Sequence, residues 1–227
     1  QFVDQYLIEY LGIQAIVVGY DHGFGKDRSG NIETMQAMAT DRGFEVVSVP
    51  PTLLDGAPVS STRVRGHVEL GEMEGAARLL DAGYPVSGVV EAGDARGRTI
   101  GFPTANIALE DNKLLPPDGV YAGWVRQNGV SGLACVINLG TRPTFDGNDR
   151  HFEVHILDYD QDLYGKRLSI DLVTRLRAEQ KFSGIDELKT QINEDIEEAR
   201  CRLDATSISI DAHNRSTDGG REVGTDK

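Results

Sequence analysis

The spacing of apolar residues divides the chain into a first part of alternating helices and strands and a second part of short strands. In the first part, apolar runs at 13–19 and 44–49 predict two strands. Helical spacing predicts helices at 2–10 and 31–42, and Gly43 supplies a stop signal for the second. This order is typical of an α/β nucleotide-binding sheet, whose parallel strands are buried.

Two more helices precede the change of pattern. Ser60 or Ser61 can cap a helix that runs to Leu70, and residues 72–80 form another. From residue 86 onward, short β-rich runs are broken by Gly, Pro and Asn. The predicted strands are 86–90, 104–109, 120–126, 133–139, 152–159 and 168–176. Six short strands separated by turn signals predict a small antiparallel barrel.

One amphipathic helix follows the predicted barrel. Its apolar residues recur in steps of three and four and are Ile185, Leu188, Ile192, Ile196, Ala199 and Leu203. Such a stripe predicts a helix that lies on the barrel. Residues 205–227 have no sustained pattern, so we expect a disordered tail. The expected domains are therefore an α/β part at 1–83 and a barrel with its helix at 84–204.

Composition and charge limit the class of partner. The net charge is −13, and only 6 of the 23 basic residues are lysine. Because no basic stripe can hold a phosphate backbone, we expect no nucleic-acid partner. No apolar run is long enough to span a membrane and no signal peptide is visible, so we expect no membrane association and a cytoplasmic location. The two isolated cysteines form neither a zinc motif nor a disulfide framework, and nothing indicates an oligomeric state.

A stretch rich in glycine and arginine begins the barrel region. Residues 93–98 read Gly-Asp-Ala-Arg-Gly-Arg, and residues 101–106 read Gly-Phe-Pro-Thr-Ala-Asn. Glycines let backbone N–H groups approach phosphate closely, and arginines add charge. Thr104 and Asn106 share one face of a predicted strand, where a hydroxyl and an amide carbonyl can ligate Mg²⁺. The alternative is a plain glycine-rich hairpin that starts a strand.

Three polar residues alternate along a later strand. His151, Glu153 and His155 lie on one face because side chains on a strand repeat every two residues. Glu153 can serve as a general base toward an attacking hydroxyl. Alternatively, the three side chains chelate a transition metal, or they form the exposed face of a strand whose buried face carries Phe152 and Val154.

Two other charged segments are candidates. Residues 60–65, Ser-Ser-Thr-Arg-Val-Arg, place hydroxyls and two arginines at a helix start, which is the pattern of an anion site or of a plain N-cap. Residues 177–182, Arg-Ala-Glu-Gln-Lys-Phe, lie at a strand end before the final helix. A solvated turn is the simpler interpretation of the second segment.

Taken together, these segments resemble the riboflavin kinase family. The resemblance covers residues 86–203, with its motifs in family order. The motifs are Gly101-Phe-Pro-Thr-Ala-Asn106, Gly119-Val-Tyr-Ala122, Gly140-Thr-Arg-Pro-Thr144, Glu153-Val-His-Ile-Leu-Asp158, Asp162-Leu-Tyr-Gly165 and Arg177-Ala-Glu-Gln-Lys-Phe182. The resemblance implies a six-stranded antiparallel β-barrel with a C-terminal helix, which transfers the γ-phosphate of ATP to riboflavin and makes FMN.

The same resemblance implies roles for individual residues. Glu153 would orient and deprotonate the 5′-hydroxyl of riboflavin, and Thr104 and Asn106 would hold Mg²⁺. The ATP-binding residues would be Gly93, Gly97, Arg98, Gly101, Pro103, Thr104 and Asn106. The flavin ring would pack near Arg177, Lys181 and Phe182. The alternative is a flavin-binding module without catalysis.

The first part resembles the FMN adenylyltransferase module, a Rossmann-like nucleotidyltransferase domain that precedes the kinase in the bacterial bifunctional enzyme. The matching segments are residues 19–25 and 60–65. The implied nucleotide-binding residues are Gly19, Asp21, Ser60, Ser61, Thr62 and Arg65. The HxGH element of that module has no counterpart before Gly19, so we expect an N-terminally truncated α/β remnant. The alternative is a fragment that also adenylylates FMN to FAD.

Overall fold

The computed structural model describes residues 2–21, 23–25, 30–93, 96–110, 112–127, 130–144 and 147–217. For residues 127, 130, 131, 142–144, 147–149 and 206–217 this description covers the backbone alone. The chain forms two compact units, Gln1–Val59 and Ser60–Lys227.

The first unit is a small α/β layer. It contains the π-helix η1 (Val3–Tyr10), strand β1 (Ala15–Gly19), helix α1 (Ile32–Arg42), strand β2 (Glu45–Val49) and the short strands β3 (Leu53–Leu54) and β4 (Ala57–Pro58). Asn31 caps α1 by accepting a hydrogen bond from the Thr34 N–H at 3.0 Å, and Gly43 ends the helix with a φ of 75°. Strands β1 and β2 pair in parallel, which confirms the predicted order and pairing.

The prediction that the strand at 13–19 is buried is wrong, and its partner strand is exposed as well. Val17, Val47 and Val49 are 66%, 41% and 48% exposed. Helix α1 covers one face of the two-stranded sheet through Met35 and Ala39. A parallel sheet that is buried on both faces needs a second layer, and the described residues supply a layer on one face only.

The first helix also differs from its prediction. Phe2, Tyr6 and Tyr10, which the spacing places in an apolar stripe, are exposed. Their rings contact one another with centroid distances of 5.5 and 5.7 Å. Val3 is buried instead. In a π-helix the hydrogen bonds join residues five apart, so the side chains that share a face differ from those of an α-helix.

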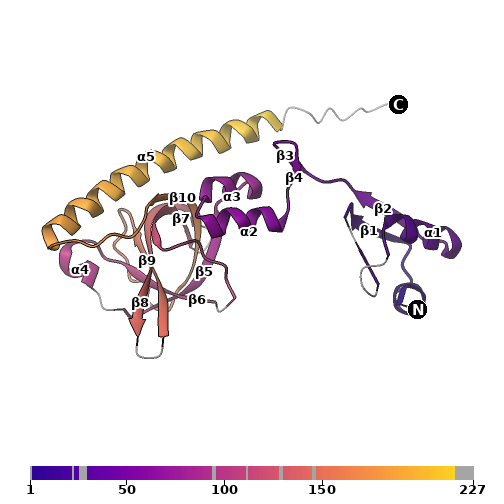
Figure 1. The fold of residues 1–227 in the computed structure, drawn as a ribbon, viewed down its shortest axis with the longest axis horizontal. Coiled ribbons are helices and arrows are strands. Elements are labelled where there is room, and N and C mark those ends of the chain that lie inside the picture. Colours follow the sequence, from indigo (N-terminus) through magenta and orange to yellow (C-terminus); the bar gives the residue numbers. More distant parts are fainter. Residues whose placement is uncertain are drawn as a thin grey trace. The chain divides into compact units, whose positions relative to one another are not determined.

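The second unit contains a closed barrel of six antiparallel strands, which confirms the predicted fold (Figure 1). The strands are β5 (Tyr84–Glu91), β6 (Ala105–Leu109), β7 (Gly119–Gln127), β8 (Val130–Thr144), β9 (Gly147–Ile156) and β10 (Arg167–Arg177). Their order around the barrel is β10, β5, β6, β9, β8 and β7, and β7 pairs again with β10. Phe152, Val154 and Ile156 point into the core, so the alternate residues of β9 face outward.

The final helix, α5 (Ile185–Thr217), covers β7, β8 and β10 from outside. Ala199 and Leu203 are fully buried there against Val120 and Val136. The predicted helix is confirmed, but its backbone continues into the predicted tail as far as Thr217. No proline or glycine interrupts the sequence between Leu203 and Thr217, so the backbone hydrogen bonds can continue. Residues 218–227 lie outside the described residues.

Helices α2 (Ser61–Leu70) and α3 (Met73–Leu80) belong to the barrel unit. Ser60 caps α2, because its Oγ accepts a hydrogen bond from the Arg63 N–H at 3.3 Å. Met73 and Ala76 are fully buried in the same core as Tyr84 of β5. Packing therefore divides the chain after Val59, whereas the change of pattern places a boundary after residue 83.

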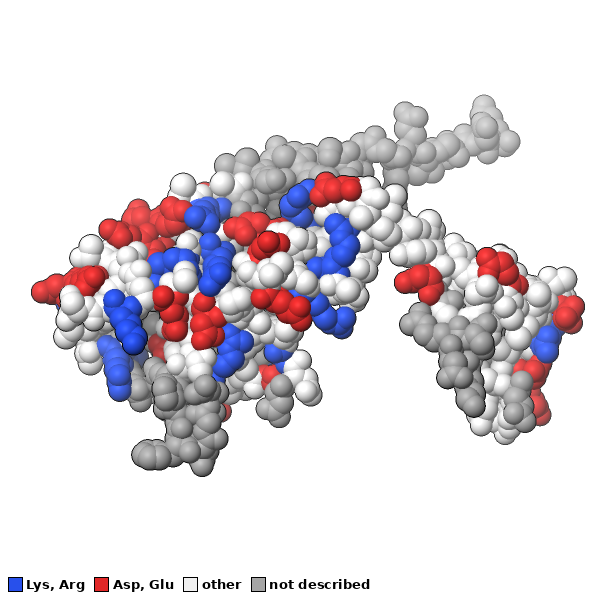
Figure 2. All heavy atoms as spheres, in the orientation of Figure 1, with Lys and Arg blue, Asp and Glu red and all other residues white. Residues whose placement is uncertain are grey.

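Charge on the barrel unit is mixed. On the face drawn in Figure 2, Lys and Arg side chains are interspersed with Asp and Glu side chains. Arg126 of β7, for example, pairs with Asp171 of β10 at 2.7 Å.

Candidate active site

The candidate site lies on the outer face of the barrel. Glu153 of β9 points away from the core, because its neighbours Phe152 and Val154 fill that core. It lies directly opposite Asn106 of β6 on one side and Asn138 of β8 on the other. Directly opposed residues on adjacent strands have Cβ atoms about 4.5 to 5.5 Å apart. Three polar side chains therefore form a continuous row across three strands.

Thr104 completes the group that the sequence singles out. It precedes β6, and its Oγ1 donates a hydrogen bond to Oε2 of Glu153 at 3.4 Å. The fold thus brings Thr104, Asn106 and Glu153 together on one face. A hydroxyl, an amide carbonyl and a carboxylate are oxygen donors of the kind that Mg²⁺ prefers.

Glycines bring the preceding loop against these side chains. A Cβ atom at Gly93 would lie 2.0 Å from Nδ2 of Asn106. A Cβ atom at Gly97 would lie 2.2 Å from the carbonyl oxygen of Phe102 and 3.4 Å from Oγ1 of Thr104. Only glycine fits at position 97, where the clash is with backbone, and a side chain at position 93 would displace the Asn106 amide. The predicted phosphate loop therefore packs against the predicted metal ligands, although its Asp94 and Ala95 lie outside the described residues.

The second half of this loop is a short helix, α4 (Arg96–Ile100). The Phe102 N–H donates to the Gly97 carbonyl oxygen at 2.8 Å, and Gly101 turns the chain with a φ of 97°. Glycine adopts this backbone conformation without strain. The turn leads through Pro103 to Thr104, so the positions of the helix and of Thr104 are linked.

The histidines that flank Glu153 have separate partners. His155 Nδ1 lies 2.7 Å from the carbonyl oxygen of Pro103, which ties β9 to the segment before Thr104. His151 Nε2 lies 3.4 Å from Nδ2 of Asn138. Within the described part of the chain, no three His, Cys, Asp or Glu residues are placed to share a metal ion. The transition-metal alternative for this strand therefore finds no support.

The predicted flavin residues lie where β10 ends. Arg177 forms a two-pronged ion pair with Asp195 of α5, with both N–O distances 2.8 Å. Asp195 is only 6% exposed, and the Arg177 guanidinium lies 5.8 Å from the centre of the Phe182 ring. Lys181 is exposed. The ion pair fixes the turn against the helix, and the flavin-binding role of these residues stays a prediction.

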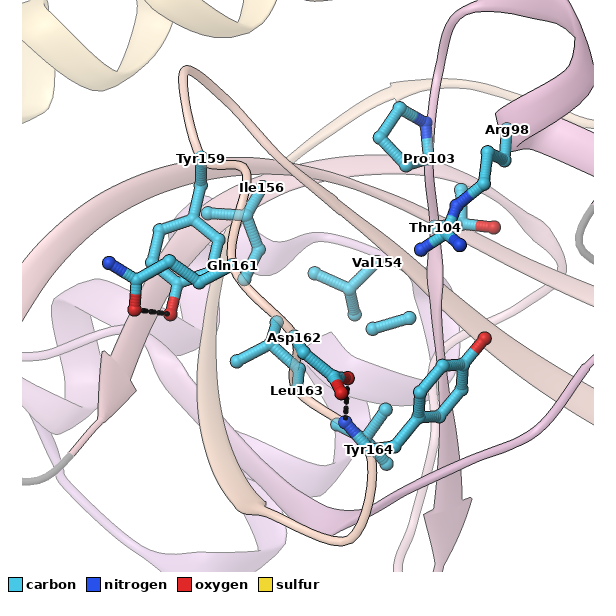
Figure 3. Close-up of a pocket in the computed structure, with 12 residues that line it drawn as sticks. Arg98, Pro103, Thr104, Val154, Ile156, Tyr159, Gln161, Asp162, Leu163 and Tyr164 are labelled. Carbon is cyan, nitrogen blue, oxygen red and sulfur yellow. Dashed lines mark hydrogen bonds between the residues drawn. The ribbon is translucent and has the colours of Figure 1, made fainter.

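A pocket opens beside the row of polar residues. Arg98, Pro103 and Thr104 line one side, and Tyr159 and residues 161–164 line the other (Figure 3). In that second segment the Tyr164 N–H donates to Oδ1 of Asp162 at 3.0 Å. The first side carries predicted ATP-binding residues, and the second side carries none. The signal for the second side is the Asp162-Leu-Tyr-Gly165 motif, which the resemblance includes without a site role.

The residues predicted for the adenylyltransferase remnant fall in different units. Gly19 and Asp21 belong to the first unit. Ser60 caps α2 in the second unit, and Ser61, Thr62 and Arg65 lie in its first turns. Nucleotide binding by these residues stays a prediction, and His22 lies outside the described residues.

Two family models match the chain. The model described as riboflavin kinase matches residues 80–203, and the model described as FAD synthetase matches residues 1–63. The interval between them, residues 64–79, contains most of α2 and most of α3. The family boundary therefore differs from the packing boundary at Val59.

Curated relatives carry both names. The bifunctional riboflavin kinase/FMN adenylyltransferase of Pseudomonas fluorescens is 40% identical over 201 residues, which are 88% of this chain and 64% of that protein. The protein of the same name from Escherichia coli (strain K12) is 39% identical over 86% of this chain and 62% of its own length. The protein from Bacillus subtilis (strain 168) is 39% identical over 88% and 63%. The chain thus spans less than two thirds of these relatives.

A solved structure has a similar fold. A crystal structure from Streptococcus pneumoniae, described as that of a macrolide-efflux protein, matches with a TM-score of 0.78 and 37% identity. The match covers 88% of this chain and 64% of that one. Among the helices in the described ranges of this chain, none has the length and apolar character needed to cross a membrane.

Proposed function

The chain belongs to the riboflavin kinase family, whose model matches more than half of its residues, and we propose that it transfers the γ-phosphate of ATP to the 5′-hydroxyl of riboflavin. The observation that carries this proposal is the position of Glu153. Its carboxylate accepts a hydrogen bond from Thr104 and lies opposite Asn106, against which the glycine loop packs. A base, oxygen ligands for a metal and a phosphate-binding loop thus meet at one place.

The proposed step uses Glu153 as a base. The 5′-oxygen of riboflavin forms a bond to the γ-phosphorus while its proton passes to the Glu153 carboxylate. The bond between the γ-phosphorus and the bridging oxygen breaks, and ADP leaves with FMN as the other product. Thr104 and Asn106 would hold Mg²⁺, which neutralises charge on the phosphates when it is bound.

ATP is proposed to bind along the loop that precedes β6. Backbone N–H groups near Gly93 and Gly97 can approach phosphate oxygens because no side chain intervenes. The Arg98 guanidinium adds a charged donor, and Arg98 and Thr104 line the same side of the pocket (Figure 3). Tyr159 and residues 161–164 line the opposite side and offer a surface for the rest of the nucleotide.

The flavin ring is proposed to lie at the turn that contains Arg177, Lys181 and Phe182. The Asp195 carboxylate holds the Arg177 guanidinium, so the turn is organised before ligand arrives. ATP, riboflavin and Mg²⁺ are the only partners that this reaction needs. We therefore propose a cytoplasmic enzyme without a nucleic-acid or membrane partner.

A second candidate activity is the adenylylation of FMN to FAD. It is motivated by the FAD synthetase match at residues 1–63 and by the double name of the relatives. The first unit would supply Gly19 and Asp21 to that reaction.

Chromatography of flavins tests both candidates in one experiment. The chain is incubated with riboflavin, ATP and Mg²⁺, and the products are separated. FMN alone supports the kinase proposal, and FMN together with FAD establishes both activities. A folded protein that binds riboflavin without forming FMN is instead a flavin-binding module.

A further inference from the structure

The cross-strand row that contains Glu153 continues around the barrel. Asn106, Glu153, Asn138, Val120 and Arg177 are successive cross-strand partners on β6, β9, β8, β7 and β10. Each step crosses one strand spacing of about 4.8 Å. Asn106, a proposed metal ligand, therefore lies at one end of the row, and Arg177, a predicted flavin residue, lies at the other. Between them, Asn138 is the next residue after the proposed base, and Val120 beyond it is buried beneath α5.

This order constrains how riboflavin can lie. Under the proposed function, the 5′-hydroxyl reaches Glu153 and the ring lies at the 177–182 turn. The ribityl chain joins these two ends of the substrate, so it passes over Asn138. We propose that Asn138 is a specificity-determining residue that hydrogen-bonds the ribityl hydroxyls, and that His151 positions its amide. This inference rests on the proposed function. It adds to that function a pair of residues that recognises the ribityl chain of riboflavin.

The contact between Asn138 and His151 supports this role. Nδ2 of Asn138 lies 3.4 Å from Nε2 of His151, and the amide nitrogen can only donate. Nε2 of His151 is therefore the acceptor of this contact. This contact fixes which way the amide faces, and it leaves Oδ1 and a second N–H of Asn138 for hydroxyls, which both donate and accept.

Two further observations place the pair beside the flavin turn. A Cβ atom at Gly140, the next outward residue of β8, would lie 2.2 Å from Oε1 of Glu179 and 2.7 Å from Cε1 of His151. Glu179 belongs to the 177–182 turn, so the turn reaches the Gly140–His151 pair, which lies next to the Asn138–Glu153 pair along β8 and β9. Nδ1 of His151 is buried and has no hydrogen-bond partner in the described part of the chain. An unsatisfied buried polar atom is costly, and such atoms are typical of functional sites.

The test compares two flavins that differ only in the chain. Riboflavin and lumiflavin share the ring, but lumiflavin carries a methyl group in place of the ribityl chain. The Kd of each is measured by flavin fluorescence titration of the full chain. We expect Asn138→Ala to weaken riboflavin binding roughly 3- to 30-fold, as for one or two lost hydrogen bonds. Lumiflavin binding is expected to stay at the wild-type value.

Control variants separate ligand binding from folding. Asn193→Ala removes an amide on α5 that donates to the Lys189 carbonyl oxygen, and it is expected to change neither Kd. Asn138→Ser preserves a small polar side chain, and it replaces the alanine variant if that variant does not fold. Unchanged riboflavin affinity, or an equal loss for both flavins, would overturn the proposal.

The positioning role of His151 has its own readout. His151→Phe removes the acceptor and is expected to weaken riboflavin binding less than Asn138→Ala does. In the double variant, His151→Phe is expected to add nothing to the loss from Asn138→Ala, because the two act as a unit. Additive losses would contradict that coupling. All these affinities are measured without turnover, so a chain that binds riboflavin but makes no FMN fails the kinase proposal alone.

Discussion

Glu153 gains its proposed role from its neighbours. It is half-buried on the outer face, with the Thr104 hydroxyl donating to one carboxylate oxygen and an asparagine opposite it on each adjacent strand. These polar neighbours orient the carboxylate, which can then take a proton from a hydroxyl that approaches it. The histidines on either side are engaged with Asn138 and with Pro103.

Replacing Glu153 by glutamine tests the base directly. We expect Glu153→Gln to lower kcat by roughly 100-fold or more, because the amide keeps the shape but cannot accept the proton. Steady-state assays of FMN formation give the value. The exposed Glu69 of α2 provides a matched control, since Glu69→Gln should leave kcat unchanged. Wild-type turnover in Glu153→Gln would remove Glu153 from this role.

Asn106 is predicted to act through Mg²⁺. Its amide is opposite Glu153, and Gly93 packs against it. We expect Asn106→Ala to raise the Mg²⁺ concentration required for half-maximal activity, because one oxygen ligand is lost. Titration of activity with Mg²⁺ at constant ATP measures the effect, and Asn112→Ala in an exposed turn is the control. An unchanged Mg²⁺ dependence would count against this assignment.

Three barrel strands are tied together by Asp118. It lies just before β7, and its carboxylate accepts hydrogen bonds from Thr141 of β8 at 2.6 Å and from Arg150 of β9 at 2.7 Å. Burial by itself would raise the pKa of Asp118, but the hydrogen bonds from Thr141 and Arg150 outweigh burial, and the pKa is lowered. A lowered pKa in the folded state means that the ionised carboxylate stabilises the barrel.

The hydrogen-bonded Asp118 carboxylate predicts that the free energy of unfolding depends on pH. The stabilisation by Asp118 is fully present well above the ordinary aspartate pKa of about 3.9, and it is lost as the pH falls toward the lower folded-state value. We expect Asp118→Asn to cost about 1 to 2 kcal/mol of unfolding free energy at pH 7, and less as the pH approaches 3. Urea titrations measure this difference in unfolding free energy, with the fluorescence of Trp124, the single tryptophan, as the signal. A difference that is the same at pH 3 and pH 7 would exclude this explanation.

The division of the chain into two units determines which changes affect the barrel. Helix α3 places Met73, which is fully buried, in the barrel core although it precedes the residues of the riboflavin kinase match. Thr174 of β10 also donates a hydrogen bond to Glu74 of α3. Within the barrel unit, α3 therefore contributes to the core on which the site is built.

We expect Met73→Ala to destabilise the barrel by about 2 to 5 kcal/mol, the usual cost of a cavity at a buried methionine. Trp124 lies in β7, so its fluorescence reports unfolding of this unit. Met38→Ala, in the partly buried core of the first unit, is the matched control and should leave the Trp124 transition unchanged. An unchanged transition in Met73→Ala would assign α3 to the other unit.

The sequence by itself determined most of the helices and strands, because their signals are local. Capping at Asn31 and Ser60, the stop at Gly43 and the alternation of β9 all depend on nearby residues. Motifs short enough to lie in one loop or strand also indicated the family and the candidate residues Thr104, Asn106 and Glu153.

Only the tertiary structure decided which of these residues meet. Thr104 and Glu153 are separated by 49 positions, and Asn138 carries no motif that links it to either. Closure of the barrel places β6 and β8 on opposite sides of β9, and the strand register then sets Asn106 and Asn138 opposite Glu153. The burial of α3 and the exposure of Val17 were likewise decided by which apolar faces find a partner layer. These outcomes depend on long-range pairing and packing, which local patterns do not encode.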